Sequence, residues 1–156
     1  MTTPATGTPH ALDERAVAAA LFNGTWDLMD RTDRTPADDD RMLHMAHASR
    51  YHWGEVGTAE NVVRGEWQCS RVYAVLGRGE PAMHHARRAL QVCEEAGIGD
   101  WDLAFCYEAL ARAHAVAGDA AERDRWLEQG RRAADSVVDA EDRQQVLADL
   151  ASVPVA

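Results

Sequence analysis

The segment with the highest density of potential metal ligands runs from Arg41 to Trp53 and contains three histidines. In a helix with about 100° of rotation per residue, His44, His47 and Tyr51 fall within about 60° of one another. Two imidazoles on one helical face form a chelating pair for a divalent transition metal such as zinc. The pattern therefore predicts a metal site at His44 and His47, completed by a ligand from another helix. The candidates for that third ligand are His85, His114, Cys69 and Glu60.

The same histidines also have a purely structural interpretation. His44 and His85 occupy equivalent positions of an internal repeat, and a residue type shared by repeat copies commonly serves packing between them. An imidazole fills such a position while donating one hydrogen bond. Because the sequence also lacks a His-Glu-x-x-His motif, both hypotheses stay open for this helix.

Other catalytic signatures are missing from the sequence. It contains no Gly-rich phosphate loop and no Gly-x-Ser-x-Gly nucleophile motif. All 16 basic residues are arginines, which excludes a Schiff-base lysine and the lysine of a phosphate-binding loop. Cys69, Cys93 and Cys106 lack paired spacing, so we expect buried, reduced thiols rather than disulfides or nucleophiles.

The overall composition predicts one cytoplasmic globular domain. A chain of 156 residues with 46% apolar and 27% charged residues is long enough and apolar enough to bury a core. The formal charge of −10 argues against nucleic acid and anionic membranes as partners. The apolar run at residues 16–22 is too short for a signal peptide or a membrane span.

Gly, Pro and capping residues divide the chain into seven predicted helices and no strands. The first eleven residues have no apolar periodicity and are expected to form a flexible arm, which leaves residues 12–156 as the domain. Thr35 followed by Pro36 is a strong helix start, and Gly54 interrupts the helix that follows. Short turns between helices force neighbouring helices to run antiparallel. The predicted helices cover residues 12–30, 36–53, 59–77, 81–97, 101–118, 120–138 and 141–153, with Asp100 as the cap of the fifth.

An internal repeat of about 41 residues organises these helices into pairs. It aligns Gly24-Thr25-Trp26 with Gly65-Glu66-Trp67, and a later run from Arg71 to Gly77 with Arg112 to Gly118. Three copies of a helix pair explain the alignment, with residues 141–153 as a final helix that covers the apolar end of the stack.

This pattern resembles the tetratricopeptide repeat family. The resemblance rests on Ala109-Leu110-Ala111, His114 and Gly118-Asp119 in the last copy, and on small, aromatic and turn residues in the middle copy. The middle-copy residues are Ser70, Tyr73, Gly77, Ala82, Ala89 and Leu90. The period is longer than the roughly 34 residues usual for the family, so a generic stack of helical hairpins remains the alternative. Both imply an all-α, right-handed stack of about three antiparallel helix pairs with a C-terminal capping helix.

The resemblance implies that the first helix of each pair lines a concave groove. The groove positions that carry over to this sequence are Trp26, Arg64, Trp67, Arg71, Phe105, Glu108 and Arg112. Arginines beside aromatics suit a partner that presents a carboxylate or phosphate next to an apolar group. The alternative is that the tryptophans only pack the repeats and that the arginines pair with neighbouring acids such as Glu66 or Glu108.

Three functions follow from these observations. The first is a binding module without catalysis of its own, whose groove takes a protein, a peptide or a small anionic ligand. The second is a metal-binding protein or metal-dependent enzyme centred on His44 and His47. The third is an assembly unit such as a homodimer, which an exposed apolar face on a terminal helix would indicate.

Overall fold

The computed structural model of the chain describes residues 12–155, so the predicted arm at residues 1–11 lies outside the described part. Across residues 12–155 the chain forms seven α-helices and no strand. The helices are α1 (Glu14–Met29), α2 (Pro36–Val56), α3 (Ala59–Val75), α4 (Gly79–Ala96), α5 (Asp100–Ala117), α6 (Ala120–Asp135) and α7 (Ala140–Ala151).

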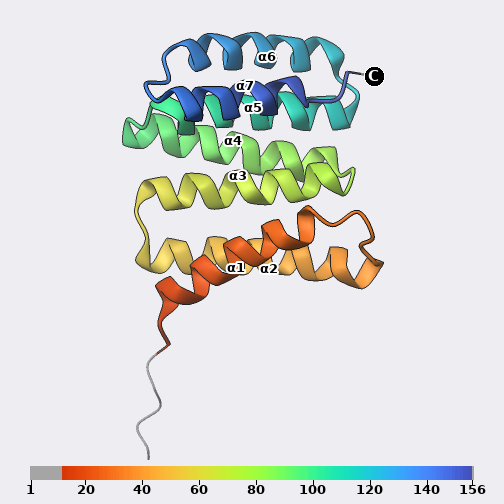
Figure 1. Cartoon of the computed structure of the whole chain (residues 1–156), viewed down its shortest axis with the longest axis vertical. Coiled ribbons are helices and arrows are strands. Elements are labelled where there is room, and N and C mark those ends of the chain that lie inside the picture. The colour runs from red at the N-terminus through yellow and green to blue at the C-terminus, as the bar shows by residue number, and fades with distance from the viewer. Residues whose placement is uncertain (1–11, 156) are drawn as a thin grey trace, which may run out of the picture.

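The helices pack as consecutive pairs that stack along the long axis of the molecule (Figure 1). α1 packs on α2, α3 on α4 and α5 on α6, and the pairs join through α2 with α3 and through α4 with α5. α7 covers α5 and α6 at the end of the stack. The predicted fold class, an all-α stack of three helix pairs with a capping helix, is confirmed.

Local sequence signals set several helix starts. Thr35 accepts a hydrogen bond from the backbone N–H of Asp38 while the Asp38 carboxylate accepts one from the backbone N–H of Thr35, which is a capping box in front of Pro36. Asp119 and Asp139 cap α6 and α7 in a similar way, since their carboxylates accept backbone N–H groups of the first helical turn.

Two predicted boundaries are wrong for identifiable reasons. α2 runs through Gly54 to Val56, because a single glycine weakens a helix without ending it. Asp100 does not cap α5 from outside but is its first residue, with a positive φ of 55°. Its carboxylate instead accepts the backbone N–H of Val138 at 3.1 Å, which ties the start of α5 to the loop before α7.

Small side chains bring the helices close together. A Cβ on Gly79 would lie 2.9 Å from the backbone of Ala117, so the start of α4 and the end of α5 touch without a side chain between them. Gly130 of α6 makes the same room for Leu150 of α7. Many of the fully buried core residues are alanines, whose small side chains also let helices pack closely. α1, α3, α5 and α7 lie around one face of the stack. In the described residues, no helix has both the length and the apolar character needed to cross a membrane.

Candidate ligand-binding groove

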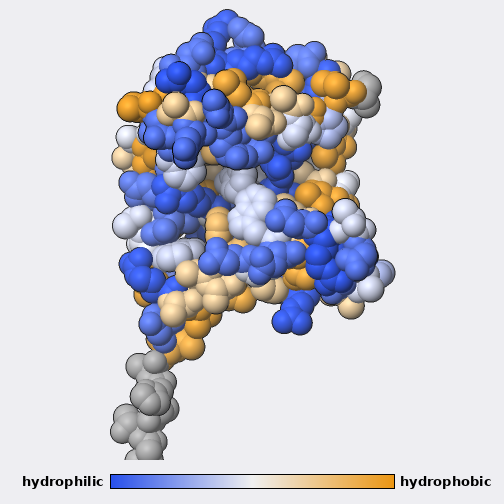
Figure 2. Space-filling view, viewed as in Figure 1, coloured by the Kyte–Doolittle hydropathy of each residue, from blue (hydrophilic) through white to orange (hydrophobic). Residues whose placement is uncertain are grey.

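The concave face of the stack contains a hollow between α1 and α7, visible at the centre of the molecule in Figure 2. Its volume is about 470 Å³, and α1, α3, α5 and α7 all contribute to its walls. We refer to it as the groove. The residues that line it are Phe22, Trp26, Val63, Arg64, Trp67, Trp101, Asp102, Phe105, Asp142, Gln145 and Asp149.

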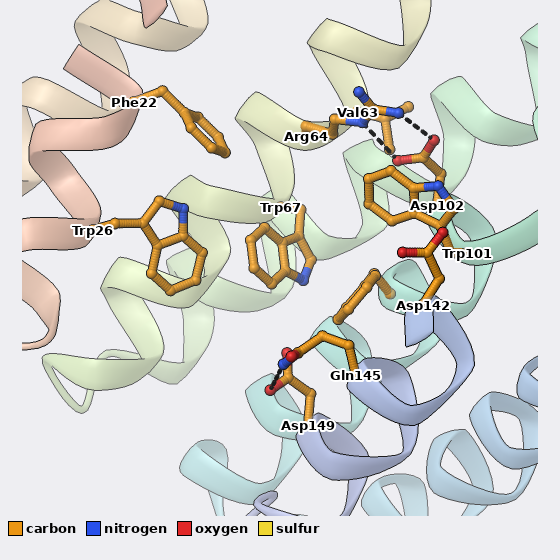
Figure 3. Close-up of a pocket in the computed structure, with 11 residues that line it drawn as sticks. Phe22, Trp26, Val63, Arg64, Trp67, Trp101, Asp102, Asp142, Gln145 and Asp149 are labelled. Atoms are coloured by element: carbon orange, nitrogen blue, oxygen red, sulfur yellow. Dashed lines mark hydrogen bonds and ion pairs between the residues drawn. The ribbon is translucent and has the colours of Figure 1, made fainter. Parts of the chain in front are cut away.

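Aromatic rings from successive helices form a continuous row in the groove (Figure 3). The centroids of Trp26 and Trp67 lie 5.4 Å apart, those of Trp67 and Phe105 5.4 Å, and those of Phe105 and Trp101 5.8 Å. The first pair is tilted and the other two meet edge to face, which are the arrangements that ring quadrupoles favour. All of these rings remain partly exposed, so the row offers an aromatic surface to a ligand.

Arg64 is held at the edge of the groove by two contacts. Its Nε and one terminal nitrogen donate to the two carboxylate oxygens of Asp102, each at 3.0 Å, in a bidentate pair. Its guanidinium carbon lies 4.4 Å from the ring centroid of Trp101. The hydrogen bonds to Asp102 are the main reason that the pKa of Arg64 is raised above its ordinary value. The Arg64 charge is therefore neutralised within the chain.

A second ion cluster borders the groove behind Trp67. Glu108 is fully buried and accepts hydrogen bonds from Arg71 at 3.0 Å and from Arg112 at 2.6 Å. The Trp67 indole N–H donates to its other carboxylate oxygen at 3.3 Å. Burial raises the pKa of Glu108, and the guanidinium groups of Arg112 and Arg71 oppose that rise. This cluster fixes the orientation of Trp67.

Arg112 also positions the capping helix against the groove. One of its terminal nitrogens donates to the carbonyl oxygen of Asp149 at 3.1 Å and to the Ser152 hydroxyl oxygen at 2.7 Å. α7 thereby presents Asp142, Gln145 and Asp149 to the aromatic row (Figure 3). The Gln145 amide donates to the Asp149 carboxylate at 3.3 Å.

The structure divides the predicted groove residues into two groups. Trp26, Arg64, Trp67 and Phe105 line the groove together. Arg71, Glu108 and Arg112 form the ion cluster at its border instead. All three predicted groove arginines pair with acids, as the alternative interpretation expects. Arg64 pairs with Asp102, and Arg71 and Arg112 pair with Glu108.

Sequence reasoning missed the residues that complete the groove. Phe22 and Trp101 each precede a predicted residue by four positions, Trp26 and Phe105 respectively, so helical spacing could have found them on the same faces. The α7 residues Asp142, Gln145 and Asp149 carried no such signal. Their place in the groove depends on how the capping helix folds back on α5 and α6.

His47 belongs to a closed polar cluster between α2, α3 and α4. One ring nitrogen of His47 lies 3.0 Å from the Tyr73 hydroxyl, and His85 stacks on the Tyr73 ring. A ring nitrogen of His85 lies 2.6 Å from Glu66, whose other oxygen accepts from Arg50 at 2.7 Å. We refer to these five residues as the polar cluster.

The electrostatics of the polar cluster follow from its burial. Burial lowers the pKa of His47, and the neighbouring His85 adds to that effect. For Glu66, burial acts to raise the pKa, but the hydrogen bonds from His85 and Arg50 outweigh it and lower the pKa overall. These contacts favour a neutral His47 beside an ionised Glu66.

The two predicted metal ligands have different surroundings. His44 is exposed, while the ring of His47 is engaged with Tyr73. Among residues 12–155, no three His, Cys, Asp or Glu side chains converge as metal ligands would. The metal site at His44 and His47 stays a prediction without a third ligand in the described part of the chain.

The three cysteines are buried and unoxidised. Burial raises the pKa of Cys69 to about 12, which keeps it a thiol. Cys93 and Cys106, which the sequence does not pair, lie in contact with their sulfurs 3.6 Å apart. Neither lines the groove.

Comparisons of this chain with protein-family models, with curated proteins and with solved structures found no match. The fold and the groove therefore define its class from their own geometry: an all-α protein of stacked helix pairs with an aromatic cavity on the concave side.

Proposed function

We propose that this protein is a binding module without catalysis of its own, which resembles tetratricopeptide proteins and holds a ligand in its groove. The observation that carries the proposal is the row of partly exposed rings that three helices direct into one cavity. A pocket of a few hundred Å³ lined by aromatics and a few polar groups is the usual form of a small-molecule or side-chain site.

The lining of the groove supports binding over catalysis. Among the described residues that line it, none has a hydroxyl, thiol, imidazole or amine that would serve as a nucleophile. Asp102, the most enclosed carboxylate of the lining, is engaged by Arg64 on both oxygens. The lining otherwise offers the carboxylates of Asp142 and Asp149 and five aromatic rings for stacking and apolar contact.

The pairing of the arginines changes the expected ligand. An anionic ligand would have to share Arg64 with Asp102, which already accepts from Nε and one terminal nitrogen, or displace Glu108 from Arg71 and Arg112. Removing one partner from a buried ion pair leaves an uncompensated charge, which is strongly unfavourable. The geometry therefore favours a ligand held by the rings over the anion that the arginines suggest in the sequence.

The test is a binding screen with variants inside and outside the groove. Small-molecule fragments and short synthetic peptides would be screened by saturation-transfer NMR, and each hit titrated by calorimetry. Trp26→Leu removes a groove ring that belongs to none of the buried apolar clusters, whereas Tyr51→Leu removes an exposed ring on α2 outside the groove. We expect hits that Trp26→Leu weakens about tenfold or more and that Tyr51→Leu retains. Hits that both variants bind equally, or no hits, would contradict the proposal.

A further inference from the structure

The charges around the groove are matched except at one residue. Arg64 is paired with Asp102, and Arg71 and Arg112 share Glu108, with Asp149 also 4.0 Å from a terminal nitrogen of Arg71. No arginine at the groove is therefore left without an acidic partner.

Asp142 is the carboxylate in excess. It lies in the first turn of α7 and points toward the rings (Figure 3). Across residues 12–155, no hydrogen bond or ion pair of the structure engages its carboxylate. Four acids, Asp102, Glu108, Asp142 and Asp149, face three arginines, Arg64, Arg71 and Arg112, so the groove and its border carry a net charge of −1. The field of a protein with a formal charge of −10 acts in the same direction.

The rings of the groove already attract cations. The guanidinium carbon of Arg64 lies 4.4 Å from the centroid of Trp101, and that of Arg71 lies 5.9 Å from the centroid of Trp67. The electron-rich faces of tryptophan attract positive charge through the ring quadrupole, and this attraction strengthens as the cation loses water. Trp26 has no guanidinium at such a distance within the described residues, so it offers a ring to a cation from outside.

We infer that the groove binds a small organic cation with a methylated ammonium group, an inference that rests on the proposed function. A primary ammonium needs three hydrogen-bond acceptors, whereas a fully methylated one needs none and is recognised by ring faces. The lining has five aromatic rings and only one unengaged carboxylate, which suits the methylated form. The hollow of about 470 Å³ has the size of a small-molecule site, and we assign its ligand as a free molecule, with a peptide side chain as an alternative that the test below distinguishes.

The test compares two probes of the same shape and different charge. Choline carries a trimethylammonium group, and 3,3-dimethylbutan-1-ol replaces its charged nitrogen with carbon. Three of the five tryptophans, Trp26, Trp67 and Trp101, line the groove, so a change in tryptophan fluorescence accompanies binding, and calorimetry measures the dissociation constant. We expect choline to saturate with a constant on the order of a millimolar or lower. The neutral alcohol should bind about tenfold more weakly.

Two neighbouring acids provide a matched pair of variants. Asp142→Asn and Glu141→Gln remove the same charge from the same turn of α7, but only Asp142 lines the groove. Asp142→Asn should weaken choline binding about fivefold, and Glu141→Gln should change it less than twofold. Equal effects of the two variants would overturn the inference, since the charge would then act only through the general field.

The remaining outcomes separate the inference from the proposed function. Equal binding of choline and the alcohol would overturn the inference that the ligand is a cation, but it would leave the groove as an apolar binding site. If neither probe binds, the inference of a cationic ligand is overturned. The fragment and peptide screen then decides the proposed function independently. A peptide with trimethyl-lysine that binds more than tenfold tighter than choline would overturn the assignment to a free molecule.

Discussion

The groove and the polar cluster contain similar residue types and differ in access. Each combines aromatic rings, arginine and carboxylate, yet the groove is hollow and the polar cluster is filled by its own side chains. In the polar cluster every charged group faces a partner from α2, α3 or α4, whereas the groove keeps an unengaged carboxylate and partly exposed rings. The comparison teaches that open space and unmatched charge identify a site better than residue types do.

The strongest test of this comparison is the removal of the acid at the centre of the polar cluster. Glu66→Leu leaves Arg50 and His85 without their carboxylate in a largely buried position, so the free energy of unfolding should fall by about 2–3 kcal/mol. Urea denaturation measures the loss. Glu55→Gln, at an exposed site on α2, should change stability by less than about 0.5 kcal/mol.

A stability loss below about 1 kcal/mol for Glu66→Leu would break the comparison, because the polar cluster would then not be needed for folding. Trp26→Leu supplies the contrast from the groove. Its ring is partly exposed, so we expect a stability loss of at most about 1 kcal/mol together with ligand binding weakened about tenfold or more.

A smaller effect should follow from one hydroxyl of the polar cluster. Tyr73→Phe keeps the ring that stacks on His85 but removes the oxygen that lies 3.0 Å from the His47 ring nitrogen. Loss of this hydrogen bond should lower the free energy of unfolding by about 1 kcal/mol and leave choline titrations unchanged. A change in ligand affinity would connect the two regions and weaken the distinction between them.

Acid should destabilise the protein through the polar cluster. The pKa of His47 is lowered from its ordinary 6.5, chiefly by burial, so the unfolded chain binds a proton there more readily than the folded one. His85, Glu66 and His44 are the charged or titratable groups that act on it. Stability is therefore full above about pH 6.5 and falls as the pH decreases below that value.

The lowered pKa of Glu66 acts in the same direction at lower pH. Its contribution is present above its ordinary value of 4.5 and is lost as the pH falls through the folded pKa. Melting temperatures measured between pH 7.5 and 4 should decrease in both ranges. His47→Gln should flatten the decrease between pH 6.5 and 5, and a wild-type melting temperature that rises on acidification would contradict the assignment.

The smallest expected effect concerns metal. His47 is engaged with Tyr73, and residues 12–155 supply no third ligand, so EDTA should shift the melting temperature by less than about 1 °C. Elemental analysis of dialysed protein should find less than about 0.1 zinc, iron or copper per chain. A stoichiometric metal whose loss lowers the melting temperature would restore the hypothesis of a site at His44 and His47, which His44→Ala would then test.

Much of the fold could be read from local patterns, because helix starts and faces depend on residues within one or two turns. Thr35 and Pro36 begin α2 as predicted, and the repeat places Trp26 and Trp67 at equivalent positions that become neighbours in the groove. The predicted boundary at Gly54 failed because packing between helices outweighs the weak preference of one glycine.

The site required the tertiary structure. The pairing of Arg64 with Asp102 spans 38 positions, and the excess carboxylate of Asp142 belongs to a helix that carries no repeat signal. Sequence by itself determined the helices, their pairing and three rings of the row, Trp26, Trp67 and Phe105, since those follow from spacing within a helix and from repetition. Only the stacked structure decided which charges neutralise one another and which remain open, because charge matching depends on distances between helices that no local pattern encodes.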